Sequence, residues 1–335
     1  MLASVTHSQA NRKPSNHMKF PYRRMFVAGH QGMVGAAVCR IVQNDFPEVE
    51  LVLRTRSELD LCDPEQVENF FRETKPDAVI FAAAKVGGII ANASFPVEFL
   101  SQNIKMAINA IESAYRHGVS RFLFLGSTCI YPKHAPQPLA EPSLLSSPLE
   151  STNEAYALAK IVGLKLCQYY RKQFGVIYHS AMPTNLYGPG DNYHPEYSHV
   201  IPGLLRRIHD AKVQALPSVT LWGTGTPRRE FLYVDDLAKA LLHLICLDCP
   251  PDWINVGTGK EISILELAKT IATTVGFKGD FNLDMSKPDG TPLKRTDPSL
   301  IFSTGWRPET DLEIGLVKTY SDFLQGVEQG TLRGQ

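Results

Sequence analysis

The chain has 335 residues, of which 44% are hydrophobic and 20% are charged. Its 34 basic and 34 acidic residues cancel, so the composition gives no indication of a nucleic-acid or membrane surface. No apolar run reaches the ~18 residues that a membrane-spanning helix needs. The length suits one large domain, or a core domain with a smaller one beside it.

Six cysteines in a chain of this length do not predict a disulfide scaffold, and they favour a reducing compartment such as the cytoplasm. Cys246 and Cys249 form a lone C-x-x-C motif. No second pair follows at the spacing of a zinc site, so we expect no metal. Residues 1–22 contain no acidic residue and predict a disordered tail. A transit peptide has a similar composition and remains an alternative.

Strands and helices alternate along the first half of the chain. The apolar patterns predict strands over residues 24–30, 50–55, 77–84 and 121–127, and helices over residues 31–45, 63–74 and 96–118. Asp63 and Pro64 are typical of a helix start, and Gly118 is typical of a helix end. This alternation predicts an α/β fold with a doubly wound parallel sheet of the Rossmann type.

The pattern loosens after about residue 185. Residues 194–212 and the segment after Asn255 look like loops and helices added to the sheet. We therefore expect a core over residues 23–185 and a smaller C-terminal substrate-binding lobe, mainly over residues 186–330 and partly interleaved with the core.

A glycine-rich loop joins the first predicted strand to the first predicted helix. Gly29, Gly32 and Gly35 would let backbone N–H groups approach the pyrophosphate of a dinucleotide. Arg54 and Arg56 stand where an NAD site usually carries an acidic residue. Guanidinium groups bind a 2′-phosphate bidentately, which favours NADP(H), although the two arginines are equally compatible with a solvated surface pair.

Tyr156 and Lys160 lie four residues apart and share one face of a predicted helix. A lysine beside a tyrosine favours the phenolate, so we expect a lowered pKa for Tyr156 and proton transfer to or from a carbonyl oxygen. Ser127 would donate a hydrogen bond to the same oxygen. Side chains alternate between the two faces of a strand, so we expect Ser127 and Cys129 to point the same way. A cysteine at a strand end is also typical of a small buried hydrophobe.

Several blocks of the sequence resemble a known family. The glycine loop, AAAKVGG, GSTCIYP and the Tyr–Lys pair follow one another as in the extended short-chain dehydrogenase/reductases, which act on nucleotide sugars. Further blocks, including SHVIP, WGTGTPRREFLYVDD and KPDGTPLK, resemble the GDP-L-fucose synthases among them. These blocks span about residues 24 to 320. Gln31 departs from the family, which often has Arg there, and this departure places more of the NADP affinity on Arg56.

The resemblance implies a two-stage reaction on GDP-4-keto-6-deoxy-D-mannose. Both carbons beside the ketone are epimerised, and the ketone is then reduced with NADPH. Inverting a carbon requires proton removal on one face and return on the other, which the resemblance assigns to Cys129 and His199. Without it, His199 would equally suit the cap of the next helix. The implied catalytic set is Ser127, Cys129, Tyr156, Lys160 and His199.

The resemblance also implies binding residues and a homodimer formed by helix 96–118 and the helix of Tyr156. Apolar residues on the two helices (Ile104, Met106, Ile108, Ile111, Ile161, Leu164 and Leu166) fit this interface or packing on the sheet. The expected cofactor contacts are Gly29, His30, Gln31, Gly32, Met33, Val34, Gly35, Arg54, Arg56, Leu61, Ala83, Ala84, Leu125, Gly126, Lys160, Pro183, Asn185, Leu186 and His199. The expected substrate contacts are Ser127, Cys129, Asn185, His199, Val200, Arg207, Trp222, Arg229, Asp289 and Lys294.

Two rival functions remain open on the sequence. One is a 4,6-dehydratase or 4-epimerase of the same superfamily, which would retain its cofactor, usually NAD. Arg54, Arg56 and Cys129 argue against it. The other is a non-catalytic module that senses NADP(H), which the complete Ser127, Tyr156 and Lys160 set argues against.

Overall fold

A computed structural model describes residues 20–286 and 289–334. Residues 1–19 of the tail predicted over residues 1–22 therefore lie outside the described residues. Phe20 is buried, and its ring packs against the rings of Tyr22 and Phe46. The packed core thus includes Phe20.

Six parallel strands form the central sheet. In sheet order they are β2 (Glu50–Val52), β1 (Arg24–Ala28), β3 (Ala78–Phe81), β4 (Arg121–Leu125), β5 (Ile177–Pro183) and β9 (Trp253–Val256). Every pairing in this sheet is parallel, and β1, β3 and β4 are almost wholly buried apolar strands. Burial on both faces explains why these strands show continuous apolar runs rather than alternation.

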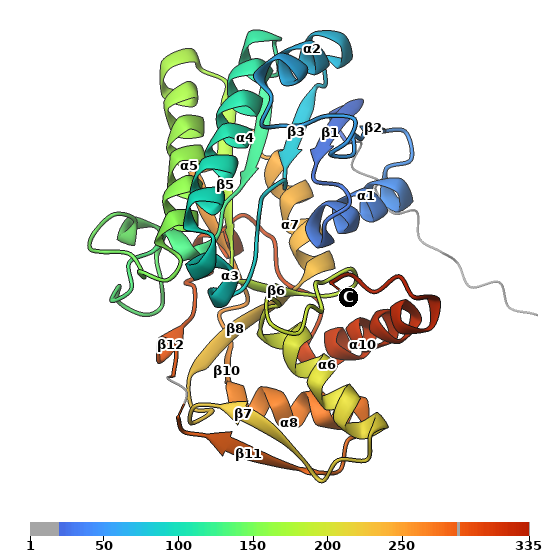
Figure 1. Ribbon diagram of the computed structural model, residues 1–335. Coiled ribbons are helices and arrows are strands. Elements are labelled where there is room, and N and C mark those ends of the chain that lie inside the picture. The colour runs from blue at the N-terminus through green and yellow to red at the C-terminus, as the bar shows by residue number, and fades with distance from the viewer. Residues whose placement is uncertain (1–19, 287–288, 335) are drawn as a thin grey trace, which may run out of the picture.

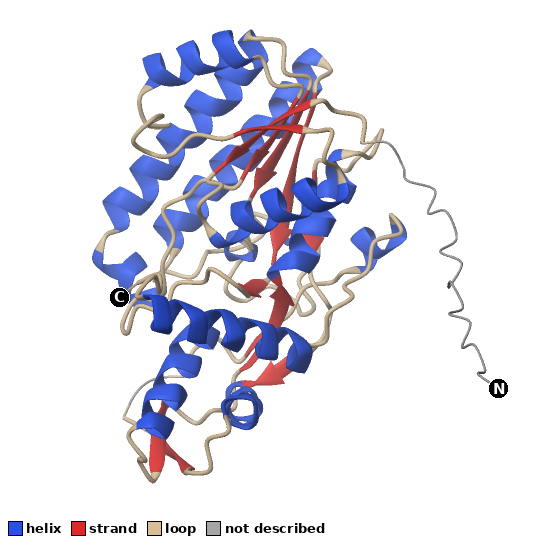
Figure 2. Ribbon diagram, turned by 90° about the vertical axis from the view of Figure 1, so that its right-hand side faces the viewer, coloured by secondary structure: helices blue, strands red, loops and turns tan. Residues whose placement is uncertain are grey.

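Helices cover both faces of the sheet, which confirms the doubly wound fold (Figures 1 and 2). One layer contains α1 (Met33–Asp45) and α7 (Val234–Ile245), which pack against each other. The other contains α2 (Pro64–Thr74), α4 (Pro96–Arg116) and α5 (Glu154–Phe174). The Asp63 side chain accepts hydrogen bonds from the first turn of α2, as its predicted capping role requires.

All four predicted strands end earlier than expected. The strands predicted over residues 24–30, 50–55, 77–84 and 121–127 end at Ala28, Val52, Phe81 and Leu125. Beyond the last of them, the hydroxyl of Ser127 accepts a hydrogen bond from the backbone N–H of Cys129 at 3.2 Å. This bond turns the chain into a short 3₁₀ helix over Thr128–Ile130, because a serine side chain competes with the strand ladder for backbone donors.

The second half of the chain adds a lobe beside the carboxyl ends of the core strands (Figure 1). Its strands are β6 (Asn185–Tyr187), β8 (Arg228–Tyr233), β10 (Glu261–Ser263) and β12 (Leu293–Lys294), with a separate ribbon of β7 (Ser218–Trp222) and β11 (Asp280–Asp284). Its helices α6 (Val200–Val213), α8 (Ile264–Val275) and α10 (Leu312–Gln329) enclose a second apolar core. The sequence patterns did not predict most of these short strands. Two further helices, α3 (Ile89–Ser94) and α9 (Ser299–Ser303), complete the described secondary structure together with the 3₁₀ turn Glu141–Ser143.

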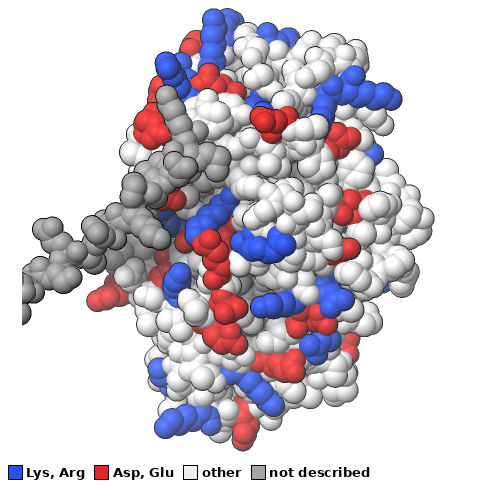
Figure 3. All heavy atoms as spheres, turned by 180° about the vertical axis from the view of Figure 1, so that it is seen from behind, with Lys and Arg blue, Asp and Glu red and all other residues white. Residues whose placement is uncertain are grey.

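The surface agrees with the balanced composition. Figure 3 shows basic and acidic side chains interspersed on one face, with no broad field of either sign. Within residues 20–286 and 289–334, no helix combines the length and the apolar character needed to cross a membrane.

Candidate active site

The turn between β1 and α1 forms a backbone cradle. Gly29 has a φ of +80°, and a Cβ there would lie 2.9 Å from the backbone of Ala83, two residues after β3. A Cβ on Gly35 would lie 2.2 Å from the carbonyl oxygen of Gly29. Only glycine fits either position, so the backbone itself shapes the loop. Gly32 is the N-cap residue of α1 and leaves the positive end of this helix open for an anion.

Polar side chains that could bind a ligand lie in the cradle and beyond β2. The Nδ1 atom of His30 is buried and has no hydrogen-bond partner among the described residues. Arg54 and Arg56 are exposed just beyond β2. The backbone N–H and the hydroxyl of Thr55 donate to the Glu58 carboxylate at 2.7 and 2.8 Å, which holds the pKa of Glu58 below its usual value and shapes the turn after β2. A dinucleotide with a 2′-phosphate fits these residues.

The other predicted cofactor residues follow the carboxyl ends of neighbouring strands. Ala83 and Ala84 follow β3, Leu125 and Gly126 close β4, and Pro183 ends β5. Because β1, β3, β4 and β5 are parallel neighbours, these ends form one edge of the sheet. Met33, Val34, Leu61, Asn185 and Leu186 belong to segments around the same edge, and Gln31 is exposed in the glycine loop.

The expectation that Ser127 and Cys129 share a strand face is wrong, because β4 has already ended. Cys129 instead belongs to the 3₁₀ turn and is partly exposed. The turn that carries Cys129 still packs against α5, the helix of Tyr156 and Lys160. The 3₁₀ turn, rather than strand alternation, brings these residues together.

Tyr156 and Lys160 lie on the same face of α5, as predicted. The Lys160 ammonium lies 5.6 Å from the centre of the Tyr156 ring and donates a 2.7 Å hydrogen bond to the carbonyl oxygen of Leu125. The predicted lowering of the tyrosine pKa is wrong for the protein alone: burial, then the nearby Cys129 thiol, raises the pKa of Tyr156. Burial also lowers the pKa of Lys160 to about 7. Desolvation outweighs the lysine charge, so Tyr156 is held as a neutral proton donor.

Lys294 connects the two proposed proton-transfer groups. Its ammonium nitrogen lies 3.7 Å from the sulfur of Cys129, although the two residues are 165 positions apart in sequence. His199 is the N-cap residue of α6 but makes no side-chain capping bond. Desolvation, then the positive charge of Lys294, lowers the pKa of His199, although the residue keeps exposed surface. Cys129 and Lys294 are therefore in contact, and His199 lies within electrostatic range of Lys294.

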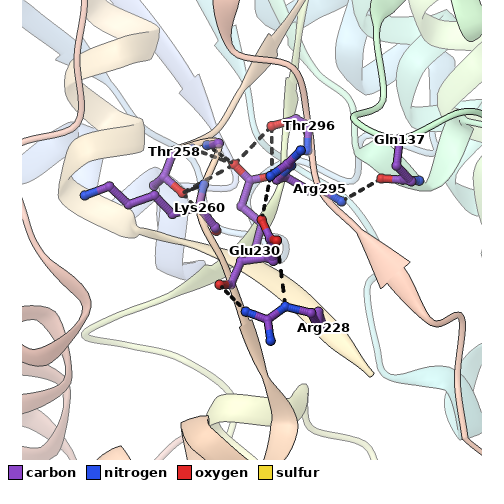
Figure 4. A network of polar contacts seen from close by, with 9 residues as sticks. Gln137, Arg228, Glu230, Thr258, Lys260, Arg295 and Thr296 are labelled. Atoms are coloured by element: carbon purple, nitrogen blue, oxygen red, sulfur yellow. Dashed lines mark hydrogen bonds and ion pairs between the residues drawn. The ribbon is translucent and has the colours of Figure 1, made fainter. Parts of the chain in front are cut away.

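A buried carboxylate that the sequence analysis missed fastens this part of the lobe (Figure 4). Glu230 on β8 is fully buried and accepts hydrogen bonds from the backbone N–H groups of Thr258, Gly259 and Thr296 at 2.6–2.7 Å. The hydroxyl of Thr296 also donates a hydrogen bond to the Glu230 carboxylate at 2.8 Å. Thr296 lies two residues beyond Lys294, so its hydrogen bonds to Glu230 fix the chain at the end of β12. The only sequence signal was a lone acid inside the apolar strand end of REFLYV.

The predicted substrate residues come from several elements of the lobe. Arg229 and Lys294 are register partners on adjacent parallel strands, so their side chains start on the same side of the sheet. Arg207 on α6 donates a hydrogen bond to the carbonyl oxygen of Thr220 at 3.2 Å, which ties α6 to the ribbon of β7. Burial lowers the pKa of Arg207 and of Arg229.

The ribbon and the loop after β11 contribute Trp222 and Asp289, and Asn185 and Val200 come from β6 and α6. Trp222 ends β7 and keeps 57% of its surface exposed. Asp289 accepts hydrogen bonds from the backbone N–H and the hydroxyl of Thr224 at 2.9 and 2.7 Å, so it joins two loops. Asn185 donates to the carbonyl oxygen of Glu230 at 2.9 Å, and Val200 begins α6 directly after His199.

Comparisons with known proteins agree with this geometry. The model of the NAD dependent epimerase/dehydratase family matches residues 25–257. The GDP-L-fucose synthase of Sinorhizobium fredii is 52% identical over 305 residues, which cover 91% of this chain and 96% of that protein. The GDP-L-fucose synthase of Escherichia coli is 52% identical over 316 residues, which cover 92% of this chain and 98% of that protein.

A solved structure shows the same architecture. It is a GDP-L-fucose synthetase from Naegleria fowleri bound to NADP, with 29% identity and a TM-score of 0.84, and the match covers 93% of this chain and 96% of that one. The fold and the resemblance inferred from the sequence are thereby confirmed. The chain belongs to the NAD dependent epimerase/dehydratase family and is similar to its GDP-L-fucose synthases over 91% of its length.

Proposed function

We propose that the chain converts GDP-4-keto-6-deoxy-D-mannose to GDP-L-fucose with NADPH, by 3,5-epimerisation and then reduction of the 4-ketone. The observation that carries the proposal is the Cys129 thiol beside the Lys294 ammonium, with His199 within electrostatic reach of that ammonium. A reductase that did not epimerise would have no use for a thiol and an imidazole at its ketone. The names of the relatives support the same product.

Epimerisation uses Cys129 and His199 in turn at the two carbons beside the ketone. One of the two groups takes the proton from a ring carbon, and the C–H electron pair moves into an enolate whose charge rests on the former ketone oxygen. The other group returns a proton to the opposite face. Ser127 and Tyr156 donate hydrogen bonds to the enolate oxygen, which lowers the barrier because the charge develops next to fixed donors.

Reduction uses the same oxygen site. The glycine cradle with Arg54 and Arg56 would hold NADPH, which would supply the hydride for the ketone carbon. Tyr156 gives its proton to the oxygen, and its raised pKa means that the proton is in place at neutral pH. Lys160 stabilises the tyrosinate that remains, since the ammonium lies against the same ring.

The lobe binds the nucleotide part of the substrate. Arg207, Arg229 and Lys294 are cations that would neutralise the diphosphate. Trp222 offers an exposed ring on which guanine or the sugar would stack, and Asp289 would accept hydrogen bonds from substrate N–H or hydroxyl groups.

We also propose a homodimer formed by α4 and α5. Val97 is 71% exposed, Tyr169 56% and Phe174 43%, so these helices present apolar surface outward. Ile111, Ile161 and Leu164 are buried. The remaining predicted interface residues, Ile104, Met106, Ile108 and Leu166, are half-buried. Mass measurement by light scattering tests the dimer.

All six cysteines are free, which favours a reducing compartment. We propose the cytoplasm, with neither nucleic acid nor membrane as a partner.

The decisive experiment supplies GDP-4-keto-6-deoxy-D-mannose and NADPH and follows both. We expect one NADPH oxidised per GDP-L-fucose formed. A retained-cofactor dehydratase or epimerase would show no net oxidation, and a sensing module would bind NADPH without turnover. Either of these results would overturn the proposal.

A further inference from the structure

The segment that leads into His199 is held by residues from the far end of the described chain. The backbone N–H of Tyr193 donates to the carbonyl oxygen of Arg333 at 2.9 Å. The Arg333 guanidinium donates to the carbonyl oxygen of Gly190 at 3.3 Å. A Cβ on Gly334 would lie 2.0 Å from the Asn192 side chain and 2.7 Å from the backbone nitrogen of His194, so this approach is close. We call residues 332–334 the arm.

Bonds inside residues 190–198, which we call the histidine loop, make it a rigid unit. The ring nitrogen Nδ1 of His194 accepts hydrogen bonds from the backbone N–H groups of Glu196 and Tyr197 at 3.1 and 3.2 Å. Arg206 on α6 donates to the carbonyl oxygen of Tyr193 at 2.8 Å. A displacement where the arm touches the loop is therefore passed on to His199, which follows directly.

The other end of the histidine loop meets the side of the site that carries Tyr156. The backbone N–H of Gly88 donates to the carbonyl oxygen of Tyr197 at 3.0 Å. Phe99 on α4 lies edge-on to the Tyr156 ring at 6.3 Å. A cavity of about 420 Å³ lies between these parts, and its lining includes Phe99, Tyr197 and Arg333. The arm thus lines the cavity that lies between the histidine loop and Phe99.

The positive charge of Arg333 in the arm also complements a buried carboxylate, Asp191, in the histidine loop. Asp191 is only 4% exposed, and its Oδ2 atom has no hydrogen-bond partner among the described residues. Burial raises the pKa of Asp191 to about 7, while the backbone N–H of Asn192 and the positive charge of Arg333 oppose this rise. A buried carboxylate without a full set of donors depends on a nearby cation, and Arg333 is the cation that acts on it.

We propose that the arm is a positioning element of the active site, with Arg333 as its positioning residue: it holds the histidine loop so that His199 stays across the sugar ring from Cys129. The inference rests on the proposed function and deepens it. Since a misplacement of about 1 Å can cost about a hundredfold in rate, loosening the arm should impair the epimerisation that uses His199 more than the reduction that uses Tyr156.

The test compares Arg333→Met, Gly334→Val and a chain ending at Gly330 with the wild type. Glu328→Gln is the matched control, because Glu328 is an exposed residue on α10 just before the arm. Arg333→Lys tests rescue, since lysine keeps the positive charge and a hydrogen-bond donor group.

The first measurement is hydrogen exchange of the loop amides without substrate. The second is the ratio of deuterium taken up at the ring carbons to NADPH oxidised.

We expect Arg333→Met to speed exchange across residues 190–198 and to lower the deuterium-to-NADPH ratio by about tenfold, with recovery in Arg333→Lys and no change in Glu328→Gln. Unchanged loop exchange in all three arm variants would overturn the inference. So would faster exchange with an unchanged ratio, which would make the arm merely structural. If the wild type fails to turn over the GDP-sugar, the proposed function fails, while the exchange data still decide whether the arm holds the loop.

Discussion

The cofactor cradle and the catalytic cleft are built in opposite ways. The cradle is backbone: Gly29 and Gly35 leave no room for a side chain, and they lie within seven residues of each other. The cleft is side chains from segments far apart, with Cys129 and Lys294 separated by 165 positions. An added side chain would therefore impair cofactor binding in the cradle by steric exclusion. The cleft would lose activity when the distant segments that carry its side chains shift.

Replacing Tyr156 by Phe should have the largest effect, because it removes the proton that the ketone oxygen receives. We expect NADPH oxidation to fall by about 10³-fold, while NADPH affinity stays unchanged because the cradle is untouched. Steady-state kinetics and a fluorescence titration measure the two quantities. Turnover close to that of the wild type would remove Tyr156 from the mechanism.

A pair of glycine substitutions tests the cradle. Gly35→Ala places a methyl group 2.2 Å from the Gly29 carbonyl oxygen, so the loop must shift and NADPH affinity should fall by roughly 10- to 100-fold. Gly32→Ala is the comparison, and we expect a smaller loss from it, because its methyl group would lie 3.3 Å from the same oxygen and its φ of −81° suits any residue. Equal losses in both variants would contradict the steric account.

Lys294→Met tests the electrostatics of the cleft. Removing the positive charge favours the imidazolium, so the pKa of His199 should rise toward its ordinary value. The pH profile of deuterium uptake should then move to higher pH, and the KM for the GDP-sugar should rise by about tenfold. Lys294→Arg keeps the charge and should keep the profile. A profile that does not move in Lys294→Met would show that Lys294 does not act on His199.

His179→Leu should have the smallest effect on the site, because this residue lies in the sheet away from both regions. His179 is fully buried without a partner for either ring nitrogen among the described residues, and burial, then Arg121 and Arg171, lowers its pKa to about 3. As the pH falls below about 6.5, the unfolded chain takes up a proton that the folded chain excludes. The wild type therefore loses roughly 1.4 kcal/mol per pH unit down to about pH 3.

The leucine variant should lack this loss. Urea unfolding at pH 7.5 and pH 5 measures it, with NADPH oxidation at pH 7.5 as the check on the site. If both proteins lose the same stability between the two pH values, His179 is not the source of the acid sensitivity.

The same contrast explains what the sequence could predict. The cradle, the capping by Asp63 and the Tyr156–Lys160 face follow from spacings of a few residues, and the structure confirms them. The face of Cys129 was predicted wrongly, because one side-chain bond from Ser127 ends the strand. The pKa of Tyr156 was predicted in the wrong direction, because burial cannot be judged from a spacing.

The anchor at Glu230 was missed for a related reason. Its partners Thr258 and Thr296 lie 28 and 66 residues further along the chain, in loops that no periodic pattern marks. Lys294 was expected only as a substrate contact, and its closeness to Cys129 depends on this anchor. Long-range polar contacts of this kind carry no local sequence signal.

The most direct test of the whole account is deuterium uptake from solvent at the ring carbons by Cys129→Ser. Serine keeps the size of the side chain but is a far weaker acid than a thiol, so we expect uptake to fall by about 10² or more while some NADPH oxidation on the unepimerised ketone continues. Uptake at the wild-type rate would contradict the role of the thiol, and with it the cleft in which Cys129 and His199 act from opposite faces of one sugar ring.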